Sequence, residues 1–343
     1  MGFNDKQIPL IDVRSPSEFA KGHIPGAISF PLFSDQERHE VGTCYKQVGK
    51  AEAIKLGLHL VSPKFSDFVK RADEIAPDKI ITAYCWRGGM RSGSIAWLLK
   101  NAGFDVKTIK GGYKAWRNES HALFGKNWRL INISGFTGTG KTEILRSLAN
   151  LGEQVIDLEG LANHKGSAFG NLGQQPTTEH FENLLGWQFM SFDSEKPIWV
   201  EDESRAIGQV YLPLEVRQQM LQAKMILIQR AKEERIAALC DDYGKVDKPI
   251  LIENFERLDR RLGGQNVKRA IDFINEGNLP DACEIALDYY DKTYAYSLEK
   301  TQRAAAQVFE VSGQTNERIA ELLIQWKHEN LPNTATAQGA DAK

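Results

Sequence analysis

A glycine-rich segment at residues 135–142 contains the residue types that bind phosphate groups. It fits G-x-x-x-x-G-K-[ST] and stands between a strand-like run and a helix-like run, which is the context this pattern requires. Glycines let backbone N–H groups turn inward around phosphate oxygens, and the helix N-terminus adds partial positive charge. A lysine supplies a full charge and a threonine supplies a hydroxyl for Mg²⁺. The sequence therefore predicts a phosphate-binding loop made by Gly135, Gly138, Gly140, Lys141 and Thr142, although the pattern does not distinguish a nucleotide from another diphosphate.

An acidic run follows the strand-like segment Ile198 to Val200. Residues 201–203 are Glu, Asp and Glu. In a P-loop sheet this place commonly carries the carboxylate that orients the metal ion or its waters. Asp202 is the first candidate for that role and Glu201 the second. An exposed acidic turn explains any one of the three residues equally well.

A cysteine stands in a second loop that also joins a strand-like run to a helix-like run. Loop amides and the helix N-terminus can face the sulfur of Cys85, and Arg87 and Arg91 add positive charge. This environment favours a thiolate and attracts an anionic sulfur or selenium donor. The two glycines between the arginines allow the loop to curl. We expect the thiolate to accept a chalcogen atom, as a persulfide or perselenide, and to pass it to an acceptor.

The remaining composition narrows the class of protein. Cys44, Cys240 and Cys283 lie far apart without CxxC pairs, so we expect small apolar side chains in a reducing cytosol rather than disulfides or a zinc site. The formal net charge of -2 means that any nucleic-acid surface must be a local patch. Neither a signal peptide nor an apolar run of about 18 residues is evident, so we expect a cytoplasmic protein that does not enter the membrane.

The segments that must position the cysteine loop, residues 85–91, alternate between strand and helix. Ile8 to Val13, Lys79 to Tyr84 and Val106 to Ile109 have strand patterns, and Ser92 to Ala102 has a helical one. A second series surrounds the glycine-rich loop. Its expected strands are Arg129 to Ser134, Val155 to Leu158, Ile198 to Glu201 and Met225 to Gln229, and its expected helices are Lys141 to Asn150, Thr178 to Phe192 and Leu214 to Gln222.

Repeated strand–helix units predict an α/β fold with mostly parallel sheets. The 343 residues exceed the ~250 at which single cores stop growing, so two domains are expected. We place the cysteine domain at 1–125 and a P-loop NTPase-like domain at 126–240. A helical extension of the P-loop domain follows at 241–330, where only Ala306 to Val311 has an extended pattern, and a polar, flexible tail at 331–343.

The first domain resembles the rhodanese family. The resemblance rests on the cysteine loop and on the segments at 10–19 (LIDVRSPSEF), 22–27 (GHIPGA) and 110–116 (KGGYKAW), and it covers about residues 5–120. Ser34 to Ser62 is a long additional segment that plain sulfurtransferases do not have. We expect this segment to shape the site that receives the acceptor.

The whole chain up to the polar tail resembles the tRNA 2-selenouridine synthases, in which a rhodanese-like domain precedes a P-loop domain. The segments at 157–167 and 199–204 add to the resemblance. It implies replacement of sulfur by selenium in wobble 2-thiouridine of tRNAs for Lys, Glu and Gln. It also implies selenophosphate and geranyl diphosphate as substrates, a geranylated intermediate, no bound organic cofactor, and the selenophosphate-producing enzyme as a partner. Lys165, beside His164 in a polar segment, is a further candidate for phosphate binding, although a solvated loop explains this segment equally well.

Basic residues on adjacent helical segments form a candidate tRNA surface, because they can contact phosphates. They are Arg257, Arg260, Arg261, Lys268 and Arg269. Two other functions also fit the sequence. One is an ATP-dependent kinase or hydrolase with a regulatory rhodanese module, which ATP turnover without tRNA would favour. The other is a binding protein without catalysis, against which the complete cysteine loop argues.

Overall fold

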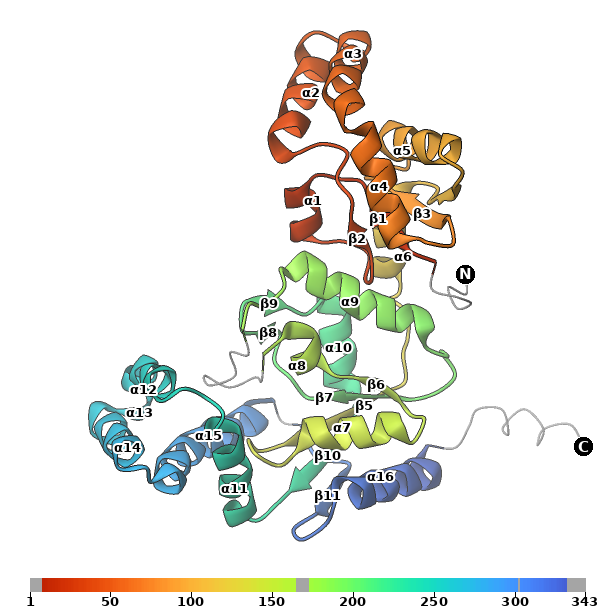
Figure 1. Cartoon of the computed structure of the whole chain (residues 1–343). Coiled ribbons are helices and arrows are strands. Elements are labelled where there is room, and N and C mark those ends of the chain that lie inside the picture. Colours follow the sequence, from red (N-terminus) through yellow and green to blue (C-terminus); the bar gives the residue numbers. More distant parts are fainter. Residues whose placement is uncertain (1–7, 165–172, 302, 332–343) are drawn as a thin grey trace, which may run out of the picture. The chain divides into compact units, whose positions relative to one another are not determined.

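The computed structural model describes residues 8–164, 173–301 and 303–331. The chain forms two compact units, each with its own parallel sheet (Figure 1). The first unit comprises residues 1–124 together with 177–190, and the second comprises 125–176 together with 191–343. The helix α9 (Thr178–Ser191) thus packs mainly with the first unit, although the sequence places it between strands of the second series.

The first unit is built on a four-stranded sheet whose strands are all parallel, in the order β2-β1-β3-β4. The strands are β1 (Leu10–Asp12), β2 (Ile28–Ser29), β3 (Ile80–Tyr84) and β4 (Asp105–Thr108). Helices α1 (Pro16–Lys21), α4 (Phe65–Ile75), α5 (Met90–Asn101) and α6 (Gly112–Ala122) connect and flank them. Apolar side chains from β1 and β3 meet those of α4 and α5 in one core, so the sheet holds the end of β3 and the start of α5 in place.

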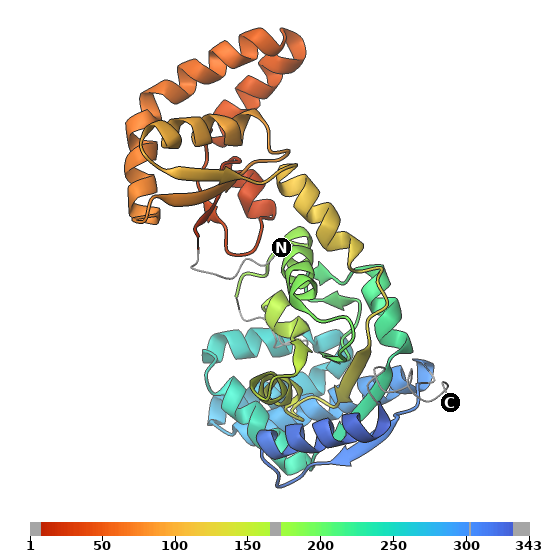
Figure 2. The same cartoon turned by 90° about the vertical axis from the view of Figure 1, so that its right-hand side faces the viewer.

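The additional segment of the first unit forms a helical hairpin. It consists of α2 (Asp35–Gln47) and α3 (Lys50–Val61), followed by the short turn η1 (Ser62–Lys64) (Figures 1 and 2). Ser34 caps α2, since its hydroxyl accepts a hydrogen bond from the Glu37 backbone N–H and the Glu37 carboxylate accepts one from the Ser34 N–H. The sequence contained this start signal, but the helical pairing of residues 34–62 was not predicted from it.

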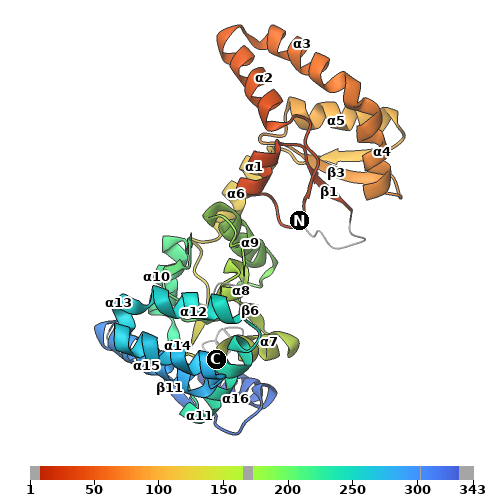
Figure 3. The same ribbon diagram turned by 60° about the vertical axis from the view of Figure 1, so that its left-hand side comes forward.

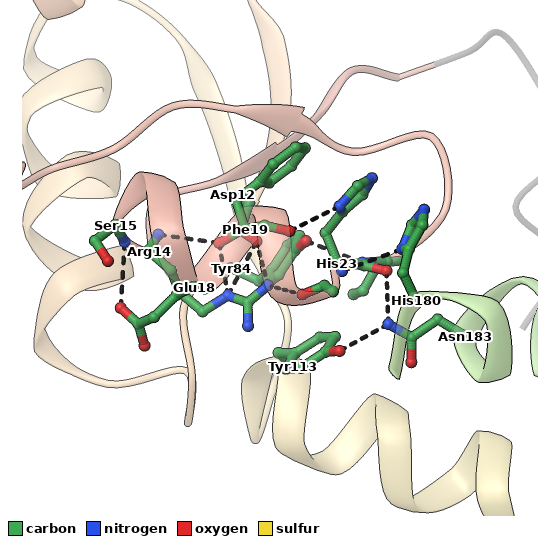
Figure 4. A network of polar contacts seen from close by, with 12 residues as sticks. Asp12, Arg14, Ser15, Glu18, Phe19, His23, Tyr84, Tyr113, His180 and Asn183 are labelled. Carbon is green, nitrogen blue, oxygen red and sulfur yellow. Dashed lines mark hydrogen bonds and ion pairs between the residues drawn. The ribbon is translucent and has the colours of Figure 1, made fainter. Parts of the chain in front are cut away.

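A buried ion pair connects the segments that carry the rhodanese resemblance (Figure 4). Arg14 Nη2 lies 2.6 Å from Asp12 Oδ2 and donates a hydrogen bond to the backbone carbonyl of Gly22. The Arg14 guanidinium also lies over the ring of Tyr113, 3.9 Å from its centroid. Both charged side chains are almost fully buried, and such pairs tolerate the removal of one partner poorly. The pair therefore fixes the start of α1 against the start of α6.

Helix α9 is held to the first unit by polar contacts with α6. Asn183 Nδ2 donates to Tyr113 Oη at 2.7 Å and to the carbonyl of His23 at 3.0 Å. The Tyr113 hydroxyl in turn donates to Glu179 at 2.8 Å. The ring of His180 stacks on that of His23 with centroids 4.0 Å apart, as Figure 4 shows from close by. The residues in these contacts lie 70 and 160 positions apart in the sequence, so a local sequence pattern does not reveal the contacts.

The stacked histidines should make the first unit acid-sensitive. Burial, followed by the charge of His23, lowers the pKa of His180 to about 4, against about 6.5 in an unfolded chain. Between these values the unfolded state binds more protons, so stability falls as the pH drops from about 6.5 to 4. The His180→Phe substitution keeps the aromatic stacking. We expect it to reduce the loss of unfolding free energy between pH 7 and pH 5 by about 1 kcal/mol, after allowance for the partial exposure of His180.

Urea unfolding at the two pH values measures this effect. His59→Phe is the matched control, because His59 is exposed on α3. Equal pH dependence in the His180 and His59 variants would show that the stacked pair does not set the acid sensitivity.

The second unit contains a five-stranded parallel sheet in the order β11-β10-β5-β7-β6. Its strands are β5 (Leu130–Gly135), β6 (Gln154–Ile156), β7 (Ile198–Glu201), β10 (Lys224–Gln229) and β11 (Gln307–Glu310). Helices α7 (Lys141–Asn150), α8 (Leu158–Ala162), α10 (Leu214–Gln222) and α16 (Asn316–Asn330) connect and cover it, and β8 (Ala206–Ile207) pairs with β9 (Val210–Tyr211). The predicted α/β class with parallel sheets is confirmed.

The helical part of the second unit lies between two strands of its sheet rather than after the last one. It comprises α11 (Lys232–Tyr243), α12 (Lys248–Arg257), α13 (Asp259–Leu262), α14 (Gly264–Glu276) and α15 (Leu279–Thr301), which Figure 3 shows gathered together. These helices share a separate apolar core that includes Phe255 and Leu287. The chain then returns to the sheet as β11, where the sequence predicted an extended segment. Among the described residues, no helix is long and apolar enough to cross a membrane.

Candidate functional site

The cysteine loop curls because its glycines lie against another segment of backbone. Gly112 has a φ of +61°, and a Cβ atom there would lie 2.2 Å from the carbonyl oxygen of Cys85. Gly88, with a φ of +63°, would place a Cβ 2.5 Å from the carbonyl oxygen of Ile109. The backbone of α6 is tied to this loop, since Tyr113 N donates to the Cys85 carbonyl at 2.9 Å. Only glycine fits both places, so the two sequence segments form one structure.

The sulfur of Cys85 lies inside a ring of hydrogen-bond donors. Ser92 Oγ is 3.3 Å from Cys85 Sγ, and the Gly89 N–H donates to the sulfur at 3.3 Å. Burial by itself raises the pKa of the thiol. The Ser92 hydroxyl, followed by the backbone N–H groups of Ser92, Gly89 and Arg87, outweighs this and lowers the Cys85 pKa below its ordinary value. The loop therefore favours a thiolate, as a nucleophilic cysteine requires.

The two loop arginines are placed differently from what their spacing suggests. Arg91 forms a two-pronged ion pair with Glu18, with nitrogen–oxygen distances of 2.5 and 3.2 Å. Its charge is thus compensated by a residue of α1. Arg87 is exposed, and its contribution to the lowered Cys85 pKa comes through its backbone N–H. Hydrogen bonds therefore account for the thiolate better than side-chain charge, and Ser92 is the contributor that the residue pattern did not single out.

Removing the Ser92 hydroxyl should raise the pKa of the Cys85 thiol, because the thiolate loses its strongest hydrogen bond. We expect Ser92→Ala to shift the pH dependence of Cys85 alkylation by iodoacetamide toward higher pH. Ser94→Ala is the control, since Ser94 is exposed on the same helix, α5. Identical alkylation profiles for the two variants would contradict the role given to Ser92.

The phosphate loop has the predicted position, between β5 and α7. Gly138 and Gly140 both have a φ of +81°, and helix α7 begins at Lys141. Lys141 Nζ donates to the Gly135 carbonyl at 2.8 Å, so the ammonium lies over the loop. A Cβ on Gly140 would lie 3.3 Å from the guanidinium of Arg230, which brings a second cation to the loop. Lys165 lies outside the described residues.

Carboxylates gather beside the hydroxyl of Thr142. Thr142 Oγ1 donates to Glu159 Oε2 at 3.3 Å, and the Glu159 N–H donates to Glu201 Oε1 at 2.6 Å. Burial, followed by repulsion from Glu203, raises the pKa of Glu159 to about 8. Burial and the neighbouring glutamates also raise the pKa of Glu201. A cation bound here would relieve this repulsion.

Asp202, the first candidate for a metal ligand, already forms ion pairs with two arginines. Its Oδ1 lies 2.7 Å from Arg303 Nη1 and 3.5 Å from Arg217 Nη1, and its Oδ2 accepts a hydrogen bond from Ser134. Within the described ranges, no group of three or more His, Cys, Asp or Glu side chains has a geometry that could hold a metal ion by itself. The arrangement favours Thr142 with Glu159 and Glu201 over Asp202 for a hydrated Mg²⁺.

The helices α11 to α15, which are inserted between strands β10 and β11, contact the phosphate loop directly. Tyr294 on α15 accepts a hydrogen bond from the Gly135 N–H at 3.0 Å, and its ring lies 4.9 Å from that of Phe136. Arg235 on α11 donates to the Thr137 carbonyl at 2.8 Å and forms an ion pair with Asp291 on α15. No motif identifies these residues, because each reaches the loop from a distant part of the chain.

The candidate tRNA residues lie on the outer surface of the inserted helices. All five are exposed: Arg257 on α12, Arg260 and Arg261 on α13, and Lys268 and Arg269 on α14. Arg257 forms an ion pair with Glu253 at 2.6 Å, so its charge is partly compensated. The five side chains thus place exposed positive charge on three consecutive helices.

Fold and sites together define a protein that joins a rhodanese-like unit with a cysteine loop to a P-loop unit. The family of rhodanese-like domains matches residues 2–119, and the tRNA 2-selenouridine synthase AAA domain matches residues 128–329. The chain is 35% identical to the tRNA 2-selenouridine synthase of Marinobacter nauticus, with 86% of this chain and 89% of the relative covered. It is 37% identical to that of a Sulfurovum species, with 85% and 89% covered. The chain belongs to the tRNA 2-selenouridine synthase family, as its sequence motifs indicated.

Proposed function

We propose that this protein is a tRNA 2-selenouridine synthase that replaces sulfur by selenium in wobble 2-thiouridine. The observation that carries the proposal is the pairing, in one chain, of a hydrogen-bonded Cys85 thiolate with a complete phosphate loop. The named relatives, which align along most of both chains, support the same activity. We further propose tRNAs for Lys, Glu and Gln as acceptors, a cytoplasmic location, and the selenophosphate-producing enzyme as a partner.

The P-loop is proposed to hold the diphosphate of geranyl diphosphate. Loop N–H groups, the α7 N-terminus and Lys141 suit a diphosphate. Mg²⁺, which keeps several waters and is bound through few protein ligands, fits Thr142 with Glu159 and Glu201 beside it. When bound, Mg²⁺ would neutralise part of the negative charge of the diphosphate. Transfer of the geranyl group breaks its C–O bond, forms a C–S bond to the thiouridine sulfur and releases diphosphate.

Selenium exchange then becomes easier, because an alkylated sulfur is a better leaving group than a thiocarbonyl sulfur. In the exchange, the C2–S bond of the base breaks and the geranyl thiol leaves with a proton. Selenium from selenophosphate forms the new bond to C2, and hydrolysis of the P–Se bond releases phosphate. Selenium in selenophosphate is already fully reduced, so a perselenide on Cys85 would need an oxidant. We therefore propose that the Cys85 thiolate acts as a covalent nucleophile at C2 and is then displaced by selenium, which keeps every oxidation state unchanged.

Purified protein, thiolated tRNA, selenophosphate and geranyl diphosphate test this function by omission of one reagent at a time. Without geranyl diphosphate, no 2-selenouridine should form, and without selenophosphate, geranylated thiouridine should accumulate. ATP hydrolysis that proceeds without tRNA, with no modified nucleoside in any mixture, would favour an ATP-dependent kinase or hydrolase instead.

The exposed arginines of the inserted helices are proposed to contribute to tRNA binding. Each lost phosphate contact lowers the slope of log affinity against log salt by about 0.7 to 0.9. We expect replacement of Arg260, Arg261 and Arg269 by Ala to flatten the slope by about two units, as measured by anisotropy titrations at several salt concentrations. Replacement of Arg146, Lys196 and Arg318, which are exposed elsewhere in the second unit, is the matched control. Equal slopes in both triple variants would place the tRNA surface elsewhere.

A further inference from the structure

A groove beside the cysteine loop has residues that the reaction described above does not use. It is lined by Trp86, Lys114, Arg117, Asn118, His121 and Ala122 and has a volume of about 470 Å³. This volume lies within the range of ~300 to 1,000 Å³ that small-ligand sites have. All six residues belong to the first unit. Five come from α6, and Trp86 comes from the loop itself.

The polar residues of the groove form one stripe along α6. Residues 114, 117, 118 and 121 have spacings of three and four, which place them on the same helical face. The stripe is fixed to the cysteine loop, because Lys114 N donates to the Trp86 carbonyl at 3.0 Å. The helix therefore presents a basic edge next to the residue that follows Cys85.

The charge of the groove comes mainly from Lys114. Arg117 is already held by Glu182 and Asn183, at 2.5 and 2.6 Å, and His121 lies 3.5 Å from the same Glu182 carboxylate. Lys114 is exposed and, in the part of the chain that the structure describes, has no ion pair. Arg87 and Lys110 are also exposed on the segments that meet at this place. An anionic ligand with several phosphates would meet an excess of positive charge here.

Trp86 adds an aromatic surface to this basic edge. Its side chain is 37% exposed, whereas Trp116 on the buried side of α6 is 7% exposed. Its ring contacts that of Tyr113, with centroids 5.7 Å apart and the two planes tilted by 48°. Basic side chains interleaved with an exposed aromatic ring are the features that bind single-stranded nucleic acid.

We propose that this groove binds a nucleotide of single-stranded RNA, with its base stacked on Trp86 and its phosphate beside Lys114. The inference rests on the proposed function, which requires the base of the reacting uridine to leave the anticodon stack and approach Cys85. Since Cys85 and Trp86 are consecutive, the base on Trp86 is the neighbour of the reacting one. The groove thus recognises the anticodon loop next to the thiolate and positions the wobble base.

Binding of a fluorescent anticodon stem-loop RNA, with unmodified uridine at the wobble position, tests the groove without chemistry. Trp86→Ala should weaken the affinity roughly 5- to 100-fold, the range for loss of one stacked base, while Trp86→Phe should retain most of it. Lys114→Glu should lower the slope of log affinity against log salt by at least about 0.7. Trp97→Ala and Lys100→Glu are matched controls, since both residues are exposed on α5 of the same unit.

Several outcomes would overturn the inference. The first is that Trp86→Ala and Lys114→Glu bind the RNA as tightly as the two control variants do, while their circular dichroism spectra match that of the parent. Another is strong binding of inorganic phosphate that depends on Lys114 while RNA binding does not, which would make the groove a site for the selenium donor. Failure of the proposed function looks different, because the parent protein would then neither bind this RNA nor modify tRNA.

Discussion

Replacement of Cys85 by alanine is expected to abolish selenium incorporation into tRNA, a loss of at least about a thousandfold for a covalent nucleophile. The reason is chemical rather than structural. The thiol is small and lies in a loop whose curl is maintained by glycines and by backbone hydrogen bonds of α6, so its removal leaves the architecture in place. Nucleoside mass spectrometry measures the loss, and circular dichroism and RNA binding should stay close to those of the parent.

Cys240→Ala and Cys283→Ala are the matched controls for this experiment. Their sulfurs lie 3.6 Å apart among the inserted helices, in contact with each other. Burial, followed by the charge of Cys240, raises the pKa of Cys283, so this residue is held as a neutral thiol. Both variants should keep selenation within about twofold of the parent. Normal selenation by Cys85→Ala would remove the thiolate from the mechanism.

Replacement of Lys141 by alanine should eliminate the geranylated intermediate, with a loss of about a hundredfold or more. The lysine ammonium is the full positive charge that the loop offers to a diphosphate, and charge stabilisation of a departing group contributes several kcal/mol to such transfers. We expect 2-thiouridine to persist and geranylated thiouridine to be absent from the modified tRNA. Chemically geranylated tRNA should still be selenated, because the cysteine centre is intact.

Arg146→Ala is the control for the lysine variant. Arg146 lies on the same helix, α7, with 66% of its side chain exposed and a nitrogen–oxygen distance of 4.0 Å to Glu143. Geranylation by this variant should match the parent. Geranylated thiouridine at parental levels in Lys141→Ala would show that another site handles the alkyl diphosphate.

Local patterns in the sequence predicted the elements next to both loops well. Helices α7 and α10 and strand β7 begin and end at the predicted residues. Each is defined by nearby signals: a glycine loop before α7, and a short apolar run before an acidic turn for β7. The extended pattern at Ala306 to Val311 is confirmed as β11, which pairs with β10 in the sheet.

Features that depend on distant contacts were not predictable in this way. The helical hairpin of α2 and α3 has weakly amphipathic helices, and several of its apolar side chains, such as Val48 and Leu58, are exposed. Tyr294 and Arg235 reach the phosphate loop across about 100 to 160 residues. The docking of α9 onto the first unit depends on Asn183, which looks like any polar helix residue in the sequence.

Charged residues beside a motif were the hardest to interpret from sequence. Arg91 and Asp202 are close in sequence to the groups they were expected to serve, but each forms ion pairs with another partner. Ser92, by contrast, forms a hydrogen bond with Cys85, and Glu159 accepts a hydrogen bond from Thr142. Spacing in the chain identifies which residues are near a site, whereas the direction of each side chain depends on its own hydrogen-bond partners.

The division of labour between the two loops can be measured in one experiment. Wobble nucleosides are analysed by mass spectrometry from cells that lack the protein and express the parent, Cys85→Ala or Lys141→Ala. The parent should yield 2-selenouridine, Cys85→Ala should stop at geranylated thiouridine, and Lys141→Ala should stop at 2-thiouridine. The same end product in both variants, or 2-selenouridine in either one at the parental level, would contradict two centres that act in sequence.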